Sequence, residues 1–334
     1  MNIIIPMAGM GKRMRPHTLT VPKPLIPIAG KPIVYRLVED IAKVCGEKID
    51  HIGFVVGHFG EEVEQNLLKI AQEVGATGSI HYQEEPLGTA HAILCAKEWL
   101  NNKVVIAFAD TLFKADFQMD TTKEGVIWVQ HVADPSAYGV IQLDKQNKIV
   151  GFVEKPKELV SNLAIIGIYY FKDGAYLRKE LEYLLDHNIK DKGEYQLTNA
   201  LENMNKKGVA FSPVQVTEWL DCGNKTSTVL TNKRYLDYIS SSELIASTAK
   251  MINSVVIPPV FLADDVKLEN AVVGPYVSIG KHTIITNSRI QNSIIQEHTQ
   301  ISDATISNSM IGNHVKWIGK SSDISVGDYT DVIN

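Results

Sequence analysis

Two spacings of apolar residues alternate along roughly the first two thirds of this chain. Short aliphatic runs such as Ile3-Ile4-Ile5 predict buried strands, whereas apolar residues that recur every three or four positions predict amphipathic helices. The expected strands cover residues 3–5, 51–56, 80–83, 103–109, 125–132, 140–143, 149–154 and 164–171. The expected helices cover residues 32–44, 61–74, 89–100, 174–187 and 196–206. Alternating strands and helices are typical of a parallel sheet, to which the later strands add hairpin character.

The pattern changes near residue 253, where short β-branched runs replace the helical period. Ile279, Ile295 and Ile311 are 16 residues apart, and a further isoleucine follows six and eleven residues after each of the first two. Three inward aliphatic side chains per turn are what a three-sided parallel β-coil requires. This pattern resembles the left-handed β-helix of hexapeptide-repeat proteins, and an ordinary β-sandwich is the alternative. The corners are expected at Gly274, Gly280, Gly312, Gly319 and Gly327.

Composition narrows the class of protein. The 33 basic and 38 acidic residues give a net charge of −5, which argues against a nucleic-acid binder that works by bulk electrostatics. Cys45, Cys95 and Cys222 are far apart and lack C-x-x-C spacing, which favours a reducing compartment over a disulfide framework or a zinc site. The chain enters its first strand without a basic leader, and no apolar run approaches 18 residues. We therefore expect a cytoplasmic protein that does not bind membranes.

The segment after the first strand has the composition of a phosphate-binding loop. Ala8, Gly9 and Gly11 follow the strand, and glycines leave backbone N–H groups free to point at an anion. Lys12, Arg13, Arg15 and Lys23 place four cations in one connection, and four prolines restrict its movement. A basic, proline-stiffened surface loop is the alternative.

Two familiar glycine motifs do not fit this loop. A dinucleotide fingerprint needs a third small residue where Met14 stands. A P-loop needs Gly at position 6 and Ser or Thr at position 13, where the chain has Pro6 and Arg13.

The loop instead reads G-x-G-x-R followed by P-K-P-L-x-P-x-x-x-K-P, which resembles the signature of sugar nucleotidylyltransferases. The resemblance implies a Rossmann-like, mainly parallel nucleotidyltransferase domain over residues 1–238, a linker over 239–252 and a β-helix over 253–334. It also implies that Ala8, Gly9, Gly11 and Arg13 bind the nucleotide. By the same resemblance, Arg13 neutralises the leaving pyrophosphate and Lys23 neutralises the α-phosphate.

Two aspartates are candidate metal ligands. Asp110 follows the apolar strand that ends at Ala109, and ligands bind at the carboxyl ends of strands in open α/β sheets. Asp221 lies between another strand and Gly223. Two carboxylates with a nucleotide between them suit Mg²⁺, and the resemblance places the family's magnesium ligands at these positions. A helix N-cap or turn is the alternative for Asp110.

Sugar-phosphate residues are suggested by Glu154-Lys155-Pro156 following Tyr138-Gly139-Val140. The resemblance implies that Lys155 pairs with the sugar phosphate and acts in catalysis. It also implies that Glu154 accepts hydrogen bonds from sugar hydroxyls and that Gly139 lets the backbone approach the sugar ring closely. Asn162 and Ile165 are further candidates on that basis. A lone lysine at a strand end is otherwise usually solvated.

Gln83 and Gly88 are candidates for reading the base. A glutamine amide both donates and accepts, which matches the O4/N3–H edge of uracil or thymine. The segment resembles the base-reading loop of uridylyl- and thymidylyltransferases. Glu84 and Glu85 could instead meet guanine, and a simple turn before a helix is a third interpretation.

The implied reaction transfers a nucleotidyl group from dTTP or UTP to a sugar 1-phosphate, with glucose 1-phosphate favoured and Mg²⁺ as cofactor. Mannose-1-phosphate guanylyltransferase and a non-catalytic regulatory subunit are the alternatives. About four or five coils are too few for the acetyltransferase site of related bifunctional enzymes, but their flat faces must be covered. We therefore expect a homo-oligomer formed through the β-helix, the catalytic domain or both.

Overall fold

A computed structural model describes residues 1–319 and 323–333, and the chain forms two compact units. The first unit comprises Met1–Gly9 and Leu37–Trp219, and the second comprises Met10–Arg36 and Leu220–Asn334. Helix α1 (Ile33–Cys45) and strand β13 (Glu218–Asp221) run across the points where the chain passes between units. The loop that carries the candidate phosphate-binding cations therefore belongs to the same unit as the C-terminal residues.

The first unit is built on a nine-stranded mixed sheet whose main path is β10-β9-β11-β6-β1-β4-β5. Its strands are β1 (Asn2–Pro6), β4 (His51–Val56), β5 (Thr77–Tyr82), β6 (Val104–Ala107), β8 (Gly125–His131), β9 (Gly139–Leu143), β10 (Ile149–Glu154), β11 (Leu163–Phe171) and β12 (Phe211–Gln215). β1 pairs in parallel with β4 and β6, whereas β11 pairs antiparallel with β6, β8 and β9. The expected mainly parallel fold with a hairpin section is confirmed.

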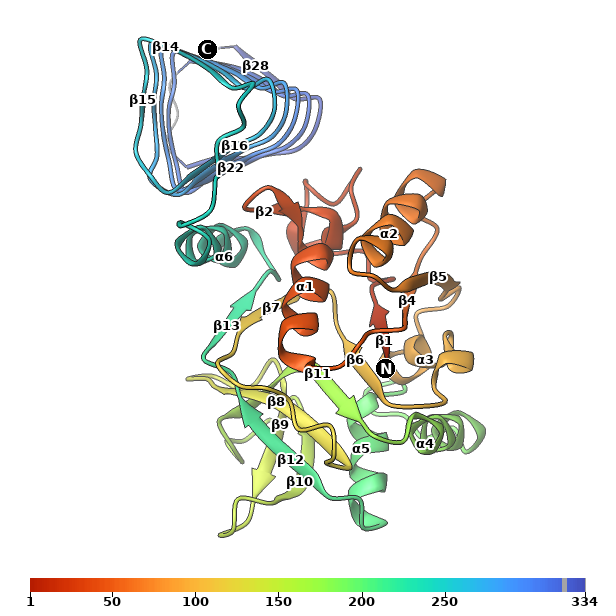
Figure 1. Cartoon of the computed structure of the whole chain (residues 1–334). Coiled ribbons are helices and arrows are strands. Elements are labelled where there is room, and N and C mark those ends of the chain that lie inside the picture. The colour runs from red at the N-terminus through yellow and green to blue at the C-terminus, as the bar shows by residue number, and fades with distance from the viewer. Residues whose placement is uncertain (320–322, 334) are drawn as a thin grey trace. The chain divides into compact units, whose positions relative to one another are not determined.

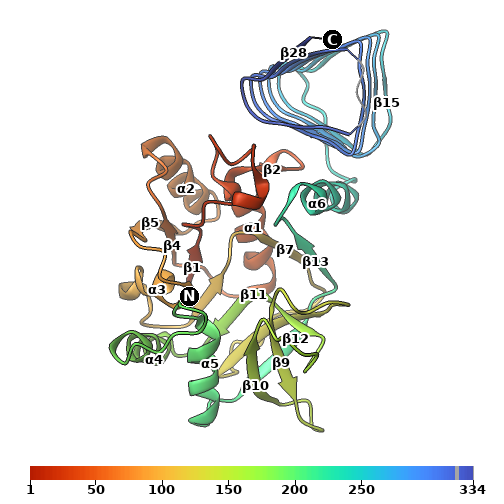
Figure 2. The same cartoon turned by 180° about the vertical axis from the view of Figure 1, so that it is seen from behind.

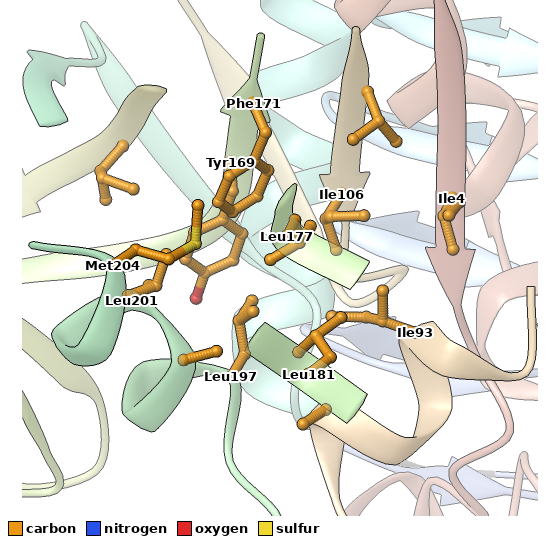
Figure 3. Close-up of a cluster of buried hydrophobic side chains, with 14 of the residues drawn as sticks. Ile4, Ile93, Ile106, Tyr169, Phe171, Leu177, Leu181, Leu197, Leu201 and Met204 are labelled. Carbon is orange, nitrogen blue, oxygen red and sulfur yellow. The ribbon is translucent and has the colours of Figure 1, made fainter. Parts of the chain in front are cut away.

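Helices cover this sheet because each presents an apolar face. They are α2 (Glu61–Glu73), α3 (Thr89–Leu94), the short 3₁₀ helix η3 (Lys97–Trp99), α4 (Gly174–Asp186) and α5 (Leu197–Lys206), and strand β7 (Thr111–Lys114) lies outside the main sheet. Figure 3 shows side chains of α3, α4 and α5 meeting those of β1, β6 and β11 in one buried cluster. Its labelled members are Ile4, Ile93, Ile106, Tyr169, Phe171, Leu177, Leu181, Leu197, Leu201 and Met204.

Helix α3 is shorter than the sequence pattern predicted, because it ends at Leu94 and η3 takes its place at Lys97. Trp99 stacks on His51 with ring centroids 3.3 Å apart. This tertiary contact holds the end of η3, a segment whose backbone is not decided by helix propensity alone.

The second unit begins with η1 (Lys12–Met14), η2 (Lys23–Leu25) and a small hairpin of β2 (Pro27–Ile28) and β3 (Lys31–Pro32). Helix α6 (Lys225–Tyr238) precedes the coil. The coil strands are β14 (Lys250–Ile252), β15 (Val255–Val256), β16 (Val260–Leu262), β17 (Lys267–Glu269), β18 (Val272–Val273), β19 (Val277–Ile279), β20 (Ile284–Thr286), β21 (Arg289–Gln291), β22 (Ser293–Ile295), β23 (Gln300–Ser302), β24 (Thr305–Ser307), β25 (Met310–Ile311), β26 (Lys316–Ile318), β27 (Ser325–Val326) and β28 (Asp331–Ile333).

These short strands stack into three parallel sheets, and the figures show the coil as a three-sided tube, in Figure 1 and from behind in Figure 2. Ile279 pairs with Ile295 and Ile295 with Ile311, so the 16-residue register read from the sequence is confirmed. The first coils are one residue longer, because Lys250 aligns with Lys267 and Lys267 with Ile284. The left-handed β-helix is the fold of this part of the chain.

The corners of the β-helix use left-handed backbone at non-glycine residues. His282, His298, His314 and Tyr329 all have positive φ, and their rings stack at centroid distances of 4.9, 4.8 and 4.8 Å. Gly280 has another role: a Cβ there would lie 2.8 Å from the carbonyl carbon of Gln296 in the next coil. Gly280 and Gly312 therefore permit close stacking, whereas Gly274 and Gly319 have positive φ of 113° and 120°.

Across the described residues, no helix combines the length and apolarity needed to cross a membrane.

Candidate functional site

The candidate phosphate loop turns at Gly11, which has the left-handed φ of 56°. Its carbonyl oxygen accepts a hydrogen bond from Oγ1 of Thr18 (2.9 Å), and η1 begins at the next residue. A Cβ on Gly11 would lie 3.0 Å from the Cβ of Lys23. The turn thus packs the two arms of the loop together and fixes Lys23 beside Gly11, whereas Ala8 and Gly9 continue the chain directly from β1.

Arg13 and Asp221 approach the same glycine within the second unit. Nη2 of Arg13 lies 3.4 Å from the position that a Cβ on Gly223 would occupy, and the Asp221 oxygens lie 2.9 and 3.2 Å from it. Arg13 is exposed to solvent, while Lys23 is buried with 9% relative exposure. The structure therefore places an exposed cation, a buried cation and a carboxylate in the second unit, with Arg13 and Asp221 meeting at Gly223.

The Asp221 carboxylate is held by its local turn. The amide of Gly223 donates to Oδ1 at 2.9 Å, and the hydroxyl of Thr231 donates to the Asp221 carbonyl oxygen at 2.8 Å. Asn224 and Ser227 then form a capping box that starts α6. One carboxylate oxygen is thus engaged by the backbone amide of Gly223.

The candidate sugar-phosphate residues cluster around Gly139 in the first unit. Gly139 and Glu154 face each other across the β9–β10 hairpin. A Cβ on Gly139 would lie 3.1 Å from Oε2 of Glu154, 3.3 Å from Cγ2 of Thr198 and 3.5 Å from Cδ1 of Ile165. Lys155 follows with a left-handed φ of 44°, and its Nζ lies 3.5 Å from Oε1 of Glu154.

Asn162 is not part of that cluster. It is exposed, and its Oδ1 contacts Nδ1 of His131 at 3.1 Å. It directly precedes β11, three residues before the buried Ile165.

The candidate base-reading residues lie together. Nε2 of Gln83 donates to the carbonyl oxygen of Gly88 at 3.2 Å and lies 3.2 Å from Nδ1 of His91. Gly88 has φ 116°, and a Cβ there would lie 2.5 Å from the carbonyl oxygen of Tyr195. Tyr195 in turn donates its amide to Leu87 and accepts from the amide of Ala90, so the 87–90 segment is fixed against the entry to α5.

Asp110 lies three residues beyond the end of β6, and its side chain is half-buried. Just beyond β6, the amide of Phe108 donates to the carbonyl oxygen of Gly167 in β11, which holds the segment before Asp110 beside the sheet. Tyr169 lies close enough to Glu154 and Asp110 for the charges of these two carboxylates to affect its pKa. Burial raises the pKa of Tyr169 well above its usual value, and the charges of Glu154 and Asp110 raise it further.

Sequence reasoning missed three residues of this region: Thr198, Tyr195 and Tyr169. The hydroxyl of Thr198 donates to Oε2 of Glu154 at 3.3 Å, which orients the carboxylate. The only local signal was Gln196 ahead of the apolar Leu197, which marks a helix start but not its contact with Glu154.

The candidate aspartates suit Mg²⁺ better than a metal ion whose ligands are all protein side chains. Within residues 1–319 and 323–333, no group of three or more His, Cys, Asp or Glu side chains could hold a metal ion. Mg²⁺ typically takes one or two carboxylates and completes its shell with phosphate oxygens and water. Asp110 offers one such carboxylate in the first unit, and Asp221 offers one in the second.

Comparison with known proteins gives a consistent result. Residues 2–237 match the family described as nucleotidyl transferase, as the loop motif predicted. The low-salt glycan biosynthesis nucleotidyltransferase Agl11 of Haloferax volcanii is 30% identical over 320 residues, which cover 88% of this chain and 87% of Agl11. The glucose-1-phosphate thymidylyltransferase of Streptomyces antibioticus is 26% identical over 318 residues, with the same coverage of 88% and 87%.

The bifunctional protein GlmU of Methanococcus maripaludis is 32% identical over 263 residues, or 77% of this chain. This chain spans only 60% of the length of that relative. A solved structure of a Bacillus anthracis protein, described as a glucose-1-phosphate thymidylyltransferase in complex with sucrose, matches with a TM-score of 0.58 and 26% identity. The match covers 69% of this chain and 93% of that one.

Proposed function

Because the chain belongs to the nucleotidyl transferase family, we propose that it transfers a nucleotidyl group from dTTP or UTP to a sugar 1-phosphate, releasing pyrophosphate. Glucose 1-phosphate is the acceptor we favour, since the Streptomyces antibioticus relative is a glucose-1-phosphate thymidylyltransferase. The observation that carries the proposal is the convergence of Arg13 and Asp221 at Gly223, in the unit whose loop also holds Lys23 against Gly11.

The sugar phosphate is the nucleophile and needs no general base. A phosphate monoester has its second pKa near 6, so at pH 7 it is largely a dianion. Its oxygen attacks the α-phosphorus, the α–β phosphoanhydride bond breaks, and pyrophosphate leaves with the bonding electrons. The obstacle is repulsion between two polyanions, which positioned cations relieve.

Each candidate cation has a distinct task in this proposal. Arg13 is exposed and can follow the β- and γ-phosphates as they leave. Lys23 is buried and fixed, which suits neutralising the α-phosphate where charge builds up. Lys155 would pair with the sugar phosphate, and Glu154 with its Thr198 partner would accept from sugar hydroxyls. Asp110 and Asp221 would hold Mg²⁺, which supplies further charge neutralisation at the phosphates.

A pyrophosphate-release assay tests the proposal. Wild-type protein is given Mg²⁺ and dTTP, UTP or GTP, each paired with glucose 1-phosphate or mannose 1-phosphate. We expect dTTP or UTP with glucose 1-phosphate to give the highest kcat/KM. A GTP preference would replace this assignment with guanylyltransferase activity, and no turnover with any pair would reject transfer altogether.

The role of the cations is tested by Arg13→Ala, with Arg289→Ala on the outward side of β21 as the matched control. One arginine at a transferring phosphate can contribute about 10³-fold or more in rate. We expect a loss of that size for Arg13→Ala and none for Arg289→Ala. Near-normal turnover in Arg13→Ala would refute the assigned role.

A further inference from the structure

The candidate phosphate loop contacts the last coil of the β-helix at three places, all within the second unit. Nε2 of His17 lies 3.1 Å from Oγ of Ser325, and the hydroxyl of Thr20 donates to Oδ2 of Asp328. Between them, a Cβ on Gly327 would lie 3.0 Å from the Cβ of Pro16. These contacts join segments that are 308 residues apart in the chain.

Asp328 is itself fixed by the coil. Its Oδ1 accepts a hydrogen bond of 2.7 Å from the backbone amide of Asn313, in the preceding coil. The two oxygens of one carboxylate therefore hold different partners, the β-helix backbone and the loop hydroxyl of Thr20. Hydrogen bonds to an ionised acceptor are about twice as strong as neutral ones.

The far end of the loop is held as well. Oδ1 of Asn232 in α6 accepts from the amide of Ala29 at 2.9 Å and from Oγ of Ser278 in β19 at 2.8 Å. Asn232 is fully buried, and a Cβ on Gly30 would lie 2.2 Å from the ring of Phe261 in β16. The β-helix thus holds the loop on both sides of Lys23.

We propose that the β-helix positions the phosphate loop for the transfer reaction, with Asp328 and Thr20 as positioning residues. Neither residue is assigned a contact with substrate, and the proposal rests on the function proposed above. The hydrogen bond restricts the loop only three residues before Lys23. A loop ordered before the nucleotide arrives loses less conformational entropy on binding, so the expected benefit is tighter triphosphate binding and correct placement of the cations.

Thr20→Val is the decisive variant, because it removes the hydroxyl, keeps the shape and alters an exposed side chain. We expect KM for the triphosphate to rise roughly tenfold, the size of losing one hydrogen bond to a charged group. The KM for sugar 1-phosphate should stay unchanged, and the melting temperature should fall by no more than a few degrees. Thr20→Ser should restore wild-type values, and Thr305→Val, an exposed threonine of β24, is the matched control.

A double-mutant cycle with Asp328→Ala tests whether the two residues act as one unit. If they do, Thr20→Val with Asp328→Ala will be no worse than Asp328→Ala alone. Additive losses, equal changes in both KM values, or an unaffected Thr20→Val enzyme would overturn the proposal.

Hydrogen exchange separates this inference from the function on which it rests. Amides 11–25 should exchange faster in Thr20→Val than in wild type or Thr305→Val, whether or not any triphosphate is turned over. Faster exchange without wild-type activity would reject the proposed reaction but keep the loop's attachment. Unchanged exchange with normal activity would reject the positioning role alone.

Discussion

Glu154 and Gly139 are in close contact across the β9–β10 hairpin. Oε2 of Glu154 lies only 3.1 Å from the position that a Cβ on Gly139 would occupy. Thr198 and Ile165 crowd the same point, so a methyl group there would displace the carboxylate or its neighbours.

Gly139→Ala should therefore raise KM for sugar 1-phosphate by roughly tenfold, about the worth of one misplaced hydrogen bond to a charged group. The KM for the triphosphate should not change. Gly53→Ala in β4 is the control, because its added Cβ would make ordinary contacts at 3.5 Å. A Gly139→Ala enzyme with wild-type KM for the sugar would show that Glu154 does not meet it.

Gly60 and Gly88 offer a matched pair, because each precedes a helix with positive φ, 92° and 116°. Nothing lies within 4 Å of a Cβ on Gly60, whereas one on Gly88 would lie 2.5 Å from the Tyr195 oxygen. Gly60→Ala should cost about 1–2 kcal/mol of unfolding free energy from backbone strain alone. Gly88→Ala should cost several kcal/mol more, since it must also push Tyr195 away. Chemical denaturation measures both, and equal losses would contradict the observed packing.

His17 should make stability depend on pH. The pKa of His17 is lowered to about 4, chiefly by burial, which outweighs the opposing charge of Asp328 and is helped by the charge of Lys225. An unfolded histidine titrates near 6.5, so between pH 6.5 and 4 the unfolded chain binds more protons than the folded one. The free energy of unfolding should fall as the pH drops from 6.5 to 4, and His17 should account for roughly 3 kcal/mol of that fall.

Urea unfolding at several pH values checks this effect. His17→Gln can keep a hydrogen bond to Ser325 without titrating, so its stability should fall less between pH 6.5 and 4. Burial also lowers the pKa of His51 to about 4, which leaves a residual loss in both proteins. Replacing the exposed His58 by Gln is the control. Identical pH profiles for His17→Gln and wild type would contradict the assignment.

Asp221→Asn tests the metal site without breaking the turn, because an amide oxygen can still accept from Gly223. We expect the melting temperature to hold, and Mn²⁺ binding with a non-hydrolysable triphosphate, read by electron paramagnetic resonance, to weaken by roughly 10–100-fold. Turnover should fall in parallel. Asp186→Asn, an exposed residue at the end of α4, is the control. Undiminished metal affinity would remove Asp221 from the candidate ligands.

Local sequence patterns predicted much of this fold, because buried positions recur with the period of the strand, helix or coil that contains them. The spacing of Ile279, Ile295 and Ile311 gave the β-helix register directly, since identical faces must stack. The run Ile3-Ile4-Ile5 predicted β1, whose three isoleucines are fully buried. The prediction was less accurate just before Asp110, because β6 ends at Ala107, opposite the point where Gly167 of β11 has a positive φ of 86°.

Contacts between distant segments were not predictable from the sequence. Thr198 meets Glu154 only because α5 packs beside β10, and no local pattern marks that pairing. Likewise, a histidine in a basic loop gives no sign that it will be buried against Ser325. Residues of this kind can be identified only from the tertiary structure, because their contact partners lie far away in the sequence.

The repeat lengths of the β-helix have a consequence for how the chain can vary in length. Because Ile284 aligns with Gln300, excising residues 284–299 would rejoin the chain in register and leave the remaining rungs stacked. The terminal rung would nevertheless shift by one strand spacing, about 4.8 Å, which is more than a hydrogen bond can bridge. Asp328 would then no longer reach Thr20. The number of rungs therefore sets the distance from the loop to the last coil, and we expect insertions or deletions of whole rungs to change catalysis even when the protein folds correctly.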